Sequence, residues 1–488
     1  MGGNRFSEKQ IFSKDHLIEI LDSTIDITLG EVDVEDVFRI ARDNPKVKGI
    51  AGMVIEQSVL GYDADPKQDC DILVDGVEVE VKSTGIVLEK NGKHEEFAAK
   101  EPMSITAVSP DCIVGETFLE SHFWRKLEHP LFIYYLYTRP GEKIKAYEYA
   151  EFPIKGYEFH SFSADEVNIL KNDWLLIQKS VLAQKSQGVK EITIPHELRK
   201  DLMLIDTAPK IRPRFRLKKT FVDTIVKNYF NKDKVTQHQV PWKFNKFSDL
   251  DRKCHELSSF FSNYTVQGLI DWFSITTNPK SKQLGESITL RMFDSDAGKL
   301  NQIELFEKVG LIGKTIKLTG KNTATEDMKL FRIDFNEFLD PDIEFEDSFI
   351  YDYFANHQFI CIIFKEEVMN ANPDKQRFLG FKRLSFDDGF IYREVHSTWE
   401  EIRDLVWSGR LQETILVDKN GNPRKNKKGN YVTSINFPKS RHFPVFVRGD
   451  GADSDDKPEH LCGIDMYRQW IWIEGNFIVK MLDGQDYL

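Results

Sequence analysis

Three segments in the first half of the chain have counterparts, in the same order, in the second half. The pairs are "HPLFIYYLYT" (129–138) with "HQFICIIFKE" (357–366), the helical pattern around Trp174 with "TWEEIRDLVW" (398–407), and "FRLKKTF" (215–221) with "IWIEGNF" (471–477). Their roughly constant offsets are typical of a tandem duplication whose loops have diverged. A chain of 488 residues is also too long for one ordinary core. We therefore expect two similar α/β domains, over residues 1–235 and 236–488.

Each half combines helical and extended patterns. Apolar residues recur at helical spacing in 15–23, 34–44 and 220–230 and predict amphipathic helices, while "GIAGMVIEQSVLG" (49–61) predicts a buried helix. The continuous apolar run at 130–138 predicts a fully buried strand. Together these helices and strands predict a mixed α/β fold.

A hairpin is predicted where "CDILV" (70–74) and "VEVEV" (77–81) flank Asp75 and Gly76, because Asp-Gly favours a two-residue type I′ turn. Counting outward pairs Ile72 with Val79 and places Asp71 opposite Glu80. Like charges so placed destabilise a strand pair unless a cation lies between them. Mg²⁺, which takes carboxylate oxygens together with water and phosphate, is the economical candidate.

Lys82 follows two residues after Glu80 and shares its face of the strand. An ammonium group there would orient or deprotonate an attacking water, while the cation stabilises charge on a phosphate. The pattern therefore favours phosphodiester hydrolysis. A solvated, charged face of an ordinary antiparallel strand is the alternative explanation of the same residues.

Two further charged residues stand in apolar surroundings. Glu56 is the one carboxylate in its apolar run, where an unpaired charge is costly, and Lys126 just precedes the predicted buried strand. A solvent-exposed helix end or an ion pair would also explain Glu56, and an ordinary surface position would explain Lys126.

The net charge of −12 counts against a nucleic-acid partner, but the basic residues are clustered. The segment "KIRPRFRLKK" contains no acid and six cations: Lys210, Arg212, Arg214, Arg216, Lys218 and Lys219. Its arginines recur at period two, which suits contacts to phosphate or guanine, although a soluble strand edge is the alternative. A second cluster (422–430) is expected to be a solvated hairpin loop, with DNA contact as the alternative, and Arg448 is a weaker candidate for DNA contact in the second half. No segment has the character of a membrane span or signal peptide, so we expect a soluble, cytoplasmic protein.

An ordered set of segments resembles the MutH family of endonucleases and its larger, Sau-type restriction enzymes. The set comprises "TLGEV" (28–32), "KGIAGMVIEQSVLG" (48–61), "GVEVEVKST" (76–84), "ESHFWRKL" (120–127), "NDWLLI" (172–177) and "FRLKKTF" (215–221). The resemblance implies the PD-(D/E)-x-K nuclease fold over most of the first 230 residues. It also implies a second, degenerate copy of the fold that binds DNA as an effector.

The resemblance also implies roles for individual residues. The implied catalytic residues are Glu56, Asp71, Glu80, Lys82 and Lys126, and the implied Mg²⁺ ligands are Asp71, Glu80, Val81 and Glu56. The basic cluster is the implied DNA-binding segment. In the second copy, Thr315 and Lys317 of "GKTIKL" are expected at the positions of Glu80 and Lys82, which would leave that copy without metal.

Two departures from the family pattern matter. Asp71 and Glu80 are farther apart in sequence than the family's acids, so Glu78 remains a rival for Glu80 or Glu56 as ligand. The segment before the basic strand, "LMLIDTAPKIRPRFRLKK" (202–219), also differs from that of relatives, which leaves the recognised sequence open.

The expected function is that of a Mg²⁺-dependent type II restriction endonuclease acting on double-stranded DNA, with GATC as the best guess from the resemblance. One active centre per chain predicts a DNA-induced homodimer or sequential nicking. A cognate DNA methyltransferase is the expected genetic partner. The alternatives are a strand-specific mismatch-repair nickase and a DNA-binding protein without catalysis.

Overall fold

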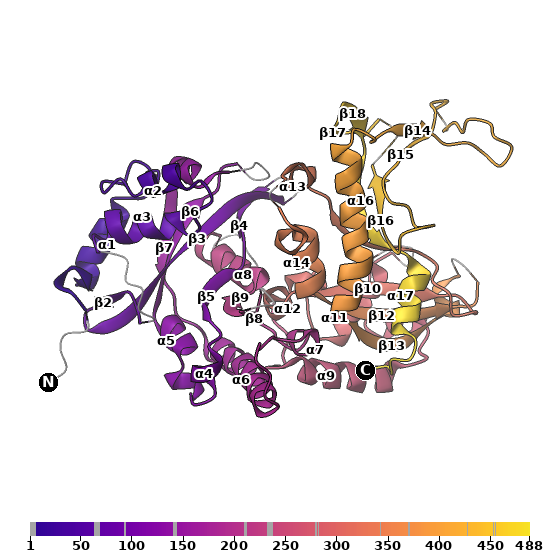
Figure 1. Ribbon diagram of the computed structural model, residues 1–488. Coiled ribbons are helices and arrows are strands. Elements are labelled where there is room, and N and C mark those ends of the chain that lie inside the picture. Colours follow the sequence, from indigo (N-terminus) through magenta and orange to yellow (C-terminus); the bar gives the residue numbers. More distant parts are fainter. Residues whose placement is uncertain are drawn as a thin grey trace. The chain divides into compact units, whose positions relative to one another are not determined.

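The protein separates into two compact units (Figure 1). The computed structural model describes residues 6–62, 69–91, 94–139, 144–208, 212–231, 238–278, 281, 283–341, 343–368, 371–426, 428–451, 453 and 455–488. Unit 1 comprises Met1–Gln237, Lys243–Phe247 and Glu304–Gly310, and unit 2 comprises His238–Trp242, Ser248–Ile303 and Leu311–Leu488. The units therefore exchange short segments instead of dividing at a single position.

A mixed sheet with the strand order β1-β2-β3-β6-β7 forms the centre of unit 1 (Figure 1). Its strands are β1 (Ile11–Phe12), β2 (Ile72–Val74), β3 (Val77–Asn91), β6 (Pro130–Leu136) and β7 (Ile154–Phe159), and β4 (His94–Ala99) pairs with the far half of β3. Strand β1 is parallel to β2 and β3 is parallel to β6, whereas β2 runs antiparallel to β3 and β7 runs antiparallel to β6. The predicted buried strand is confirmed, since six of the seven β6 residues are buried.

The helices of unit 1 mostly follow the sequence patterns. They are α1 (Lys14–Asp22), α2 (Phe38–Asp43), α3 (Ile50–Val54), α4 (Pro110–Ile113), α5 (His122–Glu128), α6 (Ala164–Ser186), α7 (His196–Arg199), α8 (Lys219–Phe230) and α12 (Glu304–Lys308). The helix predicted at 34–44 is shorter, because Asp36 has a left-handed φ of 52° and Asp33 accepts hydrogen bonds from the N–H groups of Val37 and Phe38. The helix predicted at 49–61 divides into α3 and a π-helical turn, Ile55–Val59.

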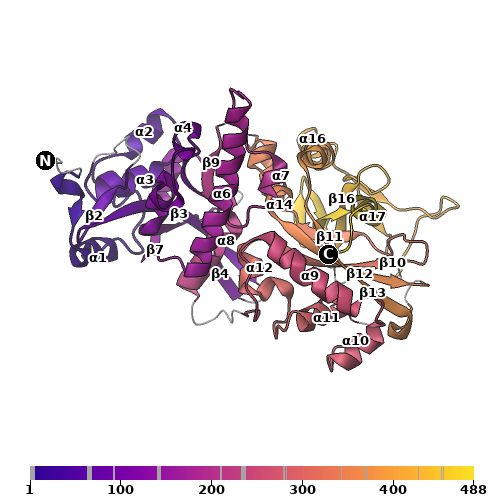
Figure 2. The same ribbon diagram turned by 90° about the horizontal axis from the view of Figure 1, so that it is seen from below.

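A second sheet in unit 1 holds the basic strand. Its order is β5 (Met103–Ala107), β9 (Arg214–Leu217), β8 (Ile205–Asp206), and helix α8 follows β9 directly. Helix α12 lies against α8 (Figure 2), where the Lys227 ammonium bonds to the carboxylates of Asp223 and Glu307 at 2.7 and 2.9 Å. The segment Glu304–Gly310, from the second half of the chain, thus forms part of unit 1.

The described residues of unit 2 form two three-stranded sheets and two small hairpins. The sheets are β10 (Leu311–Leu318), β12 (Gln358–Glu366), β13 (Gln376–Leu384), and β11 (Met328–Arg332), β19 (Arg468–Ile473), β16 (Val445–Asp450); the hairpins are β14 (Glu413–Ile415) with β15 (Thr433–Ile435), and β17 (Glu459–Leu461) with β18 (Ile464–Met466). The helices are α9 (Phe247–Phe261), α10 (Val266–Trp272), α11 (Leu284–Met292), α13 (Phe335–Leu339), α14 (Phe349–Asn356), α15 (Asp388–Phe390), α16 (His396–Trp407) and α17 (Gly475–Leu482).

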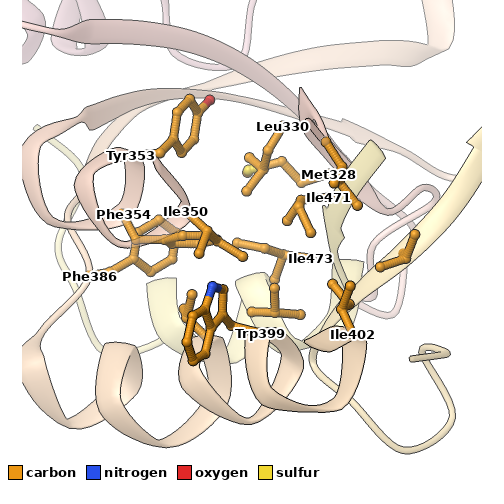
Figure 3. Close-up of a cluster of buried hydrophobic side chains, with 14 of the residues drawn as sticks. Met328, Leu330, Ile350, Tyr353, Phe354, Phe386, Trp399, Ile402, Ile471 and Ile473 are labelled. Carbon is orange, nitrogen blue, oxygen red and sulfur yellow. The ribbon is translucent and has the colours of Figure 1, made fainter. Parts of the chain in front are cut away.

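The core of unit 2 joins its two sheets and the helices that cover them (Figure 3). Phe354 from α14, Trp399 from α16 and Ile471 from β19 meet in this cluster. Burial of each such side chain contributes about 1.5–3 kcal/mol, which makes this apolar cluster a main source of stability for unit 2. Within the part of the chain that the structure describes, no helix is long and apolar enough to cross a membrane.

Candidate active site

The predicted hairpin around Asp75 and Gly76 is confirmed. Ile72 pairs with Val79 and Val74 with Val77, and both turn residues have the positive φ that a type I′ turn requires. Asp71 lies just before β2, and its N–H donates to the Val79 carbonyl at 3.2 Å. Its carboxylate accepts a hydrogen bond from the Val81 N–H at 2.8 Å. Asp71 therefore lies at the edge of the strand pair and contacts β3 beside Glu80.

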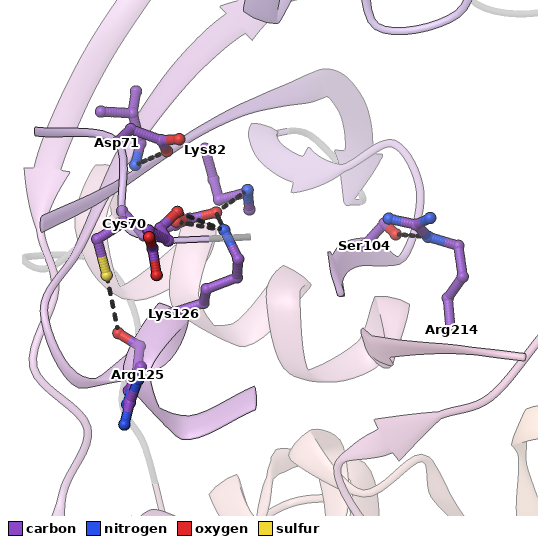
Figure 4. Close-up of polar contacts among 10 residues, drawn as sticks. Cys70, Asp71, Lys82, Ser104, Arg125, Lys126 and Arg214 are labelled. Carbon is purple, nitrogen blue, oxygen red and sulfur yellow. Dashed lines mark hydrogen bonds and ion pairs between the residues drawn. The ribbon is translucent and has the colours of Figure 1, made fainter. Parts of the chain in front are cut away.

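Glu80 is the centre of a buried ion-pair cluster with Lys82 and Lys126, the two lysines labelled in Figure 4. Its carboxylate is 1% exposed, and each oxygen accepts a hydrogen bond from the Lys126 ammonium at 2.8 Å. The ammonium of Lys82 contacts one of the same oxygens. Lys126 also donates to the Asp69 carbonyl at 3.1 Å. A carboxylate so buried is tolerated because two cations compensate its lost hydration.

Two further carboxyl groups share the electric field of this cluster. Burial, with the charge of Glu80, raises the pKa of Asp71 to about 6. Burial, with the charges of Asp71 and Glu80, raises the pKa of Glu56 to about 7. For Lys82, burial acts to lower the pKa, but the carboxylates of Glu80 and Asp71 outweigh it and raise the pKa. The structure thus gathers three acids and two lysines from three separate segments: Glu56 after α3, Asp71, Glu80 and Lys82 of the hairpin, and Lys126 of α5.

The π-helical turn after α3 positions Glu56. Helix α3 approaches β3 closely, since a Cβ at Gly52 would lie 3.4 Å from the Ser83 Oγ. The wider turn at Ile55–Val59 then presents Glu56 to the cluster, and such turns are frequent at functional sites. The sequence indicated this carboxylate but not the turn that directs it.

Tyr62 is a site residue that the sequence analysis missed. Its side chain is buried, and its hydroxyl has no hydrogen-bond partner among the described residues. Burial and the charges of Asp71 and Glu56 raise its pKa far above the ordinary value, so the hydroxyl stays protonated. An unsatisfied buried hydroxyl close to carboxylates suits a site that also contains water or a ligand.

The oxygen donors present suit a hard, hydrated cation such as Mg²⁺. Among the described side chains, however, no three acidic, histidine or cysteine groups already form a metal cage. Both oxygens of Glu80 are instead bonded to lysines. Val81 is buried in the core, so only its backbone could contribute an oxygen. The charge of Glu80 acts on the pKa of both Asp71 and Glu56, which favours Glu80 over Glu78 as the carboxylate of the cluster.

The basic segment is only partly free to meet a ligand. Arg212 and Arg214 are exposed, and the Arg214 guanidinium donates to the Ser104 Oγ at 2.8 Å. Arg216 forms an ion pair with the carboxylate of Asp206. Lys219 begins α8 and is partly exposed. Lys210 lies outside the described residues.

Lys218 has a structural position instead of the exposed one expected of a DNA contact. It is 3% exposed, and its ammonium donates to the Leu202 carbonyl at 2.7 Å. The reason is that the extended segment ends at Leu217, so period two no longer predicts which side chains face solvent. We therefore remove Lys218 from the candidate DNA contacts.

Helix α6 supports both α5, the helix that carries Lys126, and the sheet β5-β9-β8, which contains the basic strand. The buried Asp173 carboxylate accepts hydrogen bonds from the N–H groups of Met203, Leu204 and Ile205 at 2.8–3.0 Å. One turn further on, Gln178 donates to the carbonyls of Ile113 and Glu116, in the segment that leads to α5. An acid inside the apolar pattern "NDWLLI" was the available sequence signal for this role.

Comparisons with known proteins agree with this geometry. Residues 60–173 match the family model of the DNA mismatch repair enzyme MutH, and this range contains Asp71, Glu80, Lys82 and Lys126. The chain is also similar to the type II restriction enzyme Sau3AI of Staphylococcus aureus, with 23% identity over 458 residues that cover 86% of this chain and 90% of that enzyme. Residues 60–173 thus match the MutH family model, and the chain is similar over most of its length to a type II restriction enzyme.

Proposed function

We propose that the chain is a Mg²⁺-dependent type II restriction endonuclease that hydrolyses phosphodiester bonds in double-stranded DNA. The observation that carries this proposal is the buried Glu80, bonded to Lys82 and Lys126 beside Asp71 and Glu56. An arrangement of acids with paired lysines is costly to fold and suits charge-stabilised phosphoryl chemistry. The similarity to a type II restriction enzyme supports duplex DNA as the substrate.

Each residue of the site has a proposed role. Asp71, Glu80 and Glu56 would hold the cation, which supplies Lewis acidity and lowers the pKa of a bound water. Lys82 is protonated at neutral pH because its pKa is raised, so it would orient water and offset phosphate charge. Lys126 holds Glu80 in place and would exchange part of this ion pair for the scissile phosphate. Tyr62 would donate its hydroxyl hydrogen to a water of the site.

The fold of unit 2 supports a duplicated, degenerate copy. In unit 1, β3 is parallel to β6 and β6 antiparallel to β7; in unit 2, β10 is parallel to β12 and β12 antiparallel to β13. In each of the second sheets, β5-β9-β8 and β11-β19-β16, the strand that comes last in the sequence lies between the other two. Helices α8 and α17 both follow the last of these strands.

The strand register supports loss of catalysis in unit 2. Glu80 pairs with Pro130, which follows His129, and Leu311 pairs with Gln358, which follows His357. This register favours Leu311 and Gly313 over Thr315 and Lys317 as the counterparts of Glu80 and Lys82. A side chain at Gly313 would collide with Leu300.

Helix α5, which carries Lys126, has a counterpart in unit 2 as well. Ser121 caps α5 five residues before Lys126, and Ser348 caps α14 five residues before Tyr353. Glu80, Lys82 and Lys126 therefore have uncharged counterparts in Leu311, Gly313 and Tyr353. This supports a DNA-binding, non-catalytic unit 2. Arg212, Arg214 and Lys219 remain the proposed DNA contacts of unit 1.

Finer features of the function follow from the family resemblance. GATC is the proposed recognition site, a DNA-induced homodimer is the proposed cutting form, and a methyltransferase is the proposed genetic partner. A strand-specific nickase is the second candidate, favoured by the match to a mismatch repair enzyme. The catalytically inactive binder is disfavoured because the full acid and lysine set is present in unit 1.

Plasmid digestion tests the proposal. The purified protein should linearise or fragment plasmid DNA with Mg²⁺ and leave it intact with EDTA. Glu80→Gln or Lys82→Ala should abolish cleavage and keep most of the DNA affinity, whereas Glu19→Gln, an exposed substitution on α1, should cut normally. Cleavage by Glu80→Gln at the parental rate would refute the assigned centre. Open circles without further cutting would favour the nickase.

A further inference from the structure

A polar pocket lies in unit 2, far in sequence from the acids and lysines of unit 1. Its volume is about 270 Å³. It is formed at the base of the β14–β15 hairpin, by the loop before β16, by β16 itself and by the start of β19. Figure 1 shows the long loop between β14 and β15 that leaves this region. The charged lining residues are Glu413, Lys439, Arg448 and Lys457.

The charges of the pocket are unbalanced toward positive. Glu413 accepts hydrogen bonds from the Lys457 ammonium at 2.7 Å and the Thr433 hydroxyl at 2.6 Å. Arg448 forms an ion pair with Asp327 at 2.6 Å and stacks on Trp472. The Lys439 ammonium has neither a hydrogen bond nor an ion pair to any residue that the structure describes, whereas its backbone carbonyl accepts from the N–H groups of His442 and Phe443. One cation is therefore left uncompensated in a chain of net charge −12.

The surroundings of Lys439 disfavour its charge. Burial and the neighbouring Arg448 lower its pKa to about 8. The groups that face it are Arg448 on β16, Lys457 before β17, and the Glu413 carboxylate, which Lys457 already neutralises. Only an anion that enters the pocket would reverse this effect.

The nature of the anion follows from the surface beside the pocket. The loop between β14 and β15 carries exposed cations on one stretch of chain: Lys419, Arg424, Lys425 and Lys428, of which Lys428 is paired with Asp455 at 3.0 Å. A small carboxylate or a free phosphate in the pocket would not reach these loop cations, whereas a polyanion would contact both the loop and the pocket. Tyr467, which is partly exposed, also lines the pocket and offers apolar surface to a sugar.

We propose that this pocket binds a backbone phosphodiester of duplex DNA through Lys439 and Arg448. The proposal rests on the proposed DNA-binding role of unit 2 and names the site at which that unit holds its DNA. Arg448 would supply a planar pair of donors, and Lys439 a point charge, to the non-bridging phosphate oxygens. The β14–β15 loop would follow the backbone to neighbouring phosphates.

The test measures DNA binding by the full chain with Glu80→Gln, so that the duplex stays uncut. The probe is a fluorescent duplex of roughly 30 base pairs, titrated at several salt concentrations. Lys439→Gln should weaken binding several-fold and reduce the salt slope by about 1, because one phosphate contact is lost. Lys321→Gln removes an exposed charge elsewhere in unit 2 and should change neither quantity. An unchanged slope for Lys439→Gln would overturn the proposal.

A proton measurement separates a specific contact from general electrostatics. At pH 8 about half of the Lys439 side chains are uncharged, so DNA binding should take up roughly half a proton per chain. Calorimetry in two buffers of different ionisation enthalpy measures this uptake. Lys439→Arg should keep the affinity and lose the uptake; uptake that persists in this variant would contradict the assignment.

Two controls separate the possible outcomes. Lys439→Gln removes a poorly solvated charge, so its melting temperature should not fall, and weak binding cannot then be ascribed to unfolding. Inorganic phosphate at millimolar concentration should compete weakly; if phosphate raises the lysine pKa but DNA does not, the pocket is a small-anion site and the proposal is wrong. The nuclease proposal fails separately, by absence of Mg²⁺-dependent cleavage in the parent with Glu80 intact.

Discussion

Replacement of Glu56 should stabilise the protein while abolishing its proposed activity. The pKa of this carboxyl is raised from 4.5 to about 7, first by burial and then by Asp71 and Glu80. The folded state thus binds the proton more tightly than the unfolded state does. Ionisation of Glu56 therefore destabilises the fold, with no cost below pH 4.5, a growing cost between pH 4.5 and 7, and the full cost above pH 7.

The magnitude follows from the size of the pKa shift. A shift of about 2.5 units corresponds to about 3 kcal/mol at pH 8, and to about 1 kcal/mol at pH 5. Glu56→Gln removes the charge and keeps the size of the side chain, so the free energy of unfolding of unit 1 should rise by these amounts. Urea unfolding in EDTA at pH 8 and pH 5 measures the difference, and plasmid digestion measures activity.

The pH dependence of the gain is the decisive result. Glu19→Gln on α1 removes an exposed carboxylate and should leave stability nearly unchanged at both pH values. If Glu56→Gln is no more stable than the parent at pH 8, or gains equally at both pH values, then the carboxylate is not held at a cost. The conclusion that ionised Glu56 destabilises the folded state would then be refuted.

Three further predictions concern the same unit. Because the pKa values of Glu56 and Asp71 are about 7 and 6, Mg²⁺ binding should release about one proton at pH 6.5 and almost none at pH 8, as measured by calorimetry in two buffers. Asp173→Ala leaves three backbone N–H groups without their acceptor and should lower the unfolding free energy by about 3 kcal/mol or more; an unchanged melting temperature would contradict this. Arg214→Gln should lower the salt slope of DNA binding by about 1, and Arg216→Gln should lower it less, because Asp206 already neutralises Arg216.

Features set by local chemistry were predictable from the sequence. The Asp75-Gly76 turn fixed the register of the hairpin, and the apolar run at 130–138 contained β6. Helices α6 and α8 follow their apolar spacing because their buried faces are continuous. The position of Asp71 departed from simple counting, since its carboxylate accepts the Val81 N–H and its own N–H bonds to Val79.

Features set by long-range packing were not predictable in this way. Helix α12 belongs to unit 1 through the ion pairs of Lys308 with Glu166 and of Glu307 with Lys227, although it lies in the second half of the chain. No local pattern marks such a partner. The buried Lys218 was mistaken for a DNA contact because composition alone cannot tell a cation that bonds a carbonyl from one that meets phosphate.

The lysines resolve an apparent conflict in the active-site geometry. The carboxylates needed for a cation would repel one another in its absence, and Asp71 and Glu56 meet part of that cost through raised pKa values. Glu80 is compensated differently, because Lys126 bonds both of its oxygens. The same ammonium groups that stabilise the metal-free fold are thus already beside the place where a phosphate would bind. Arrival of a cation at Glu80 would then release positive charge toward the substrate, so that one set of residues serves both folding and the proposed chemistry.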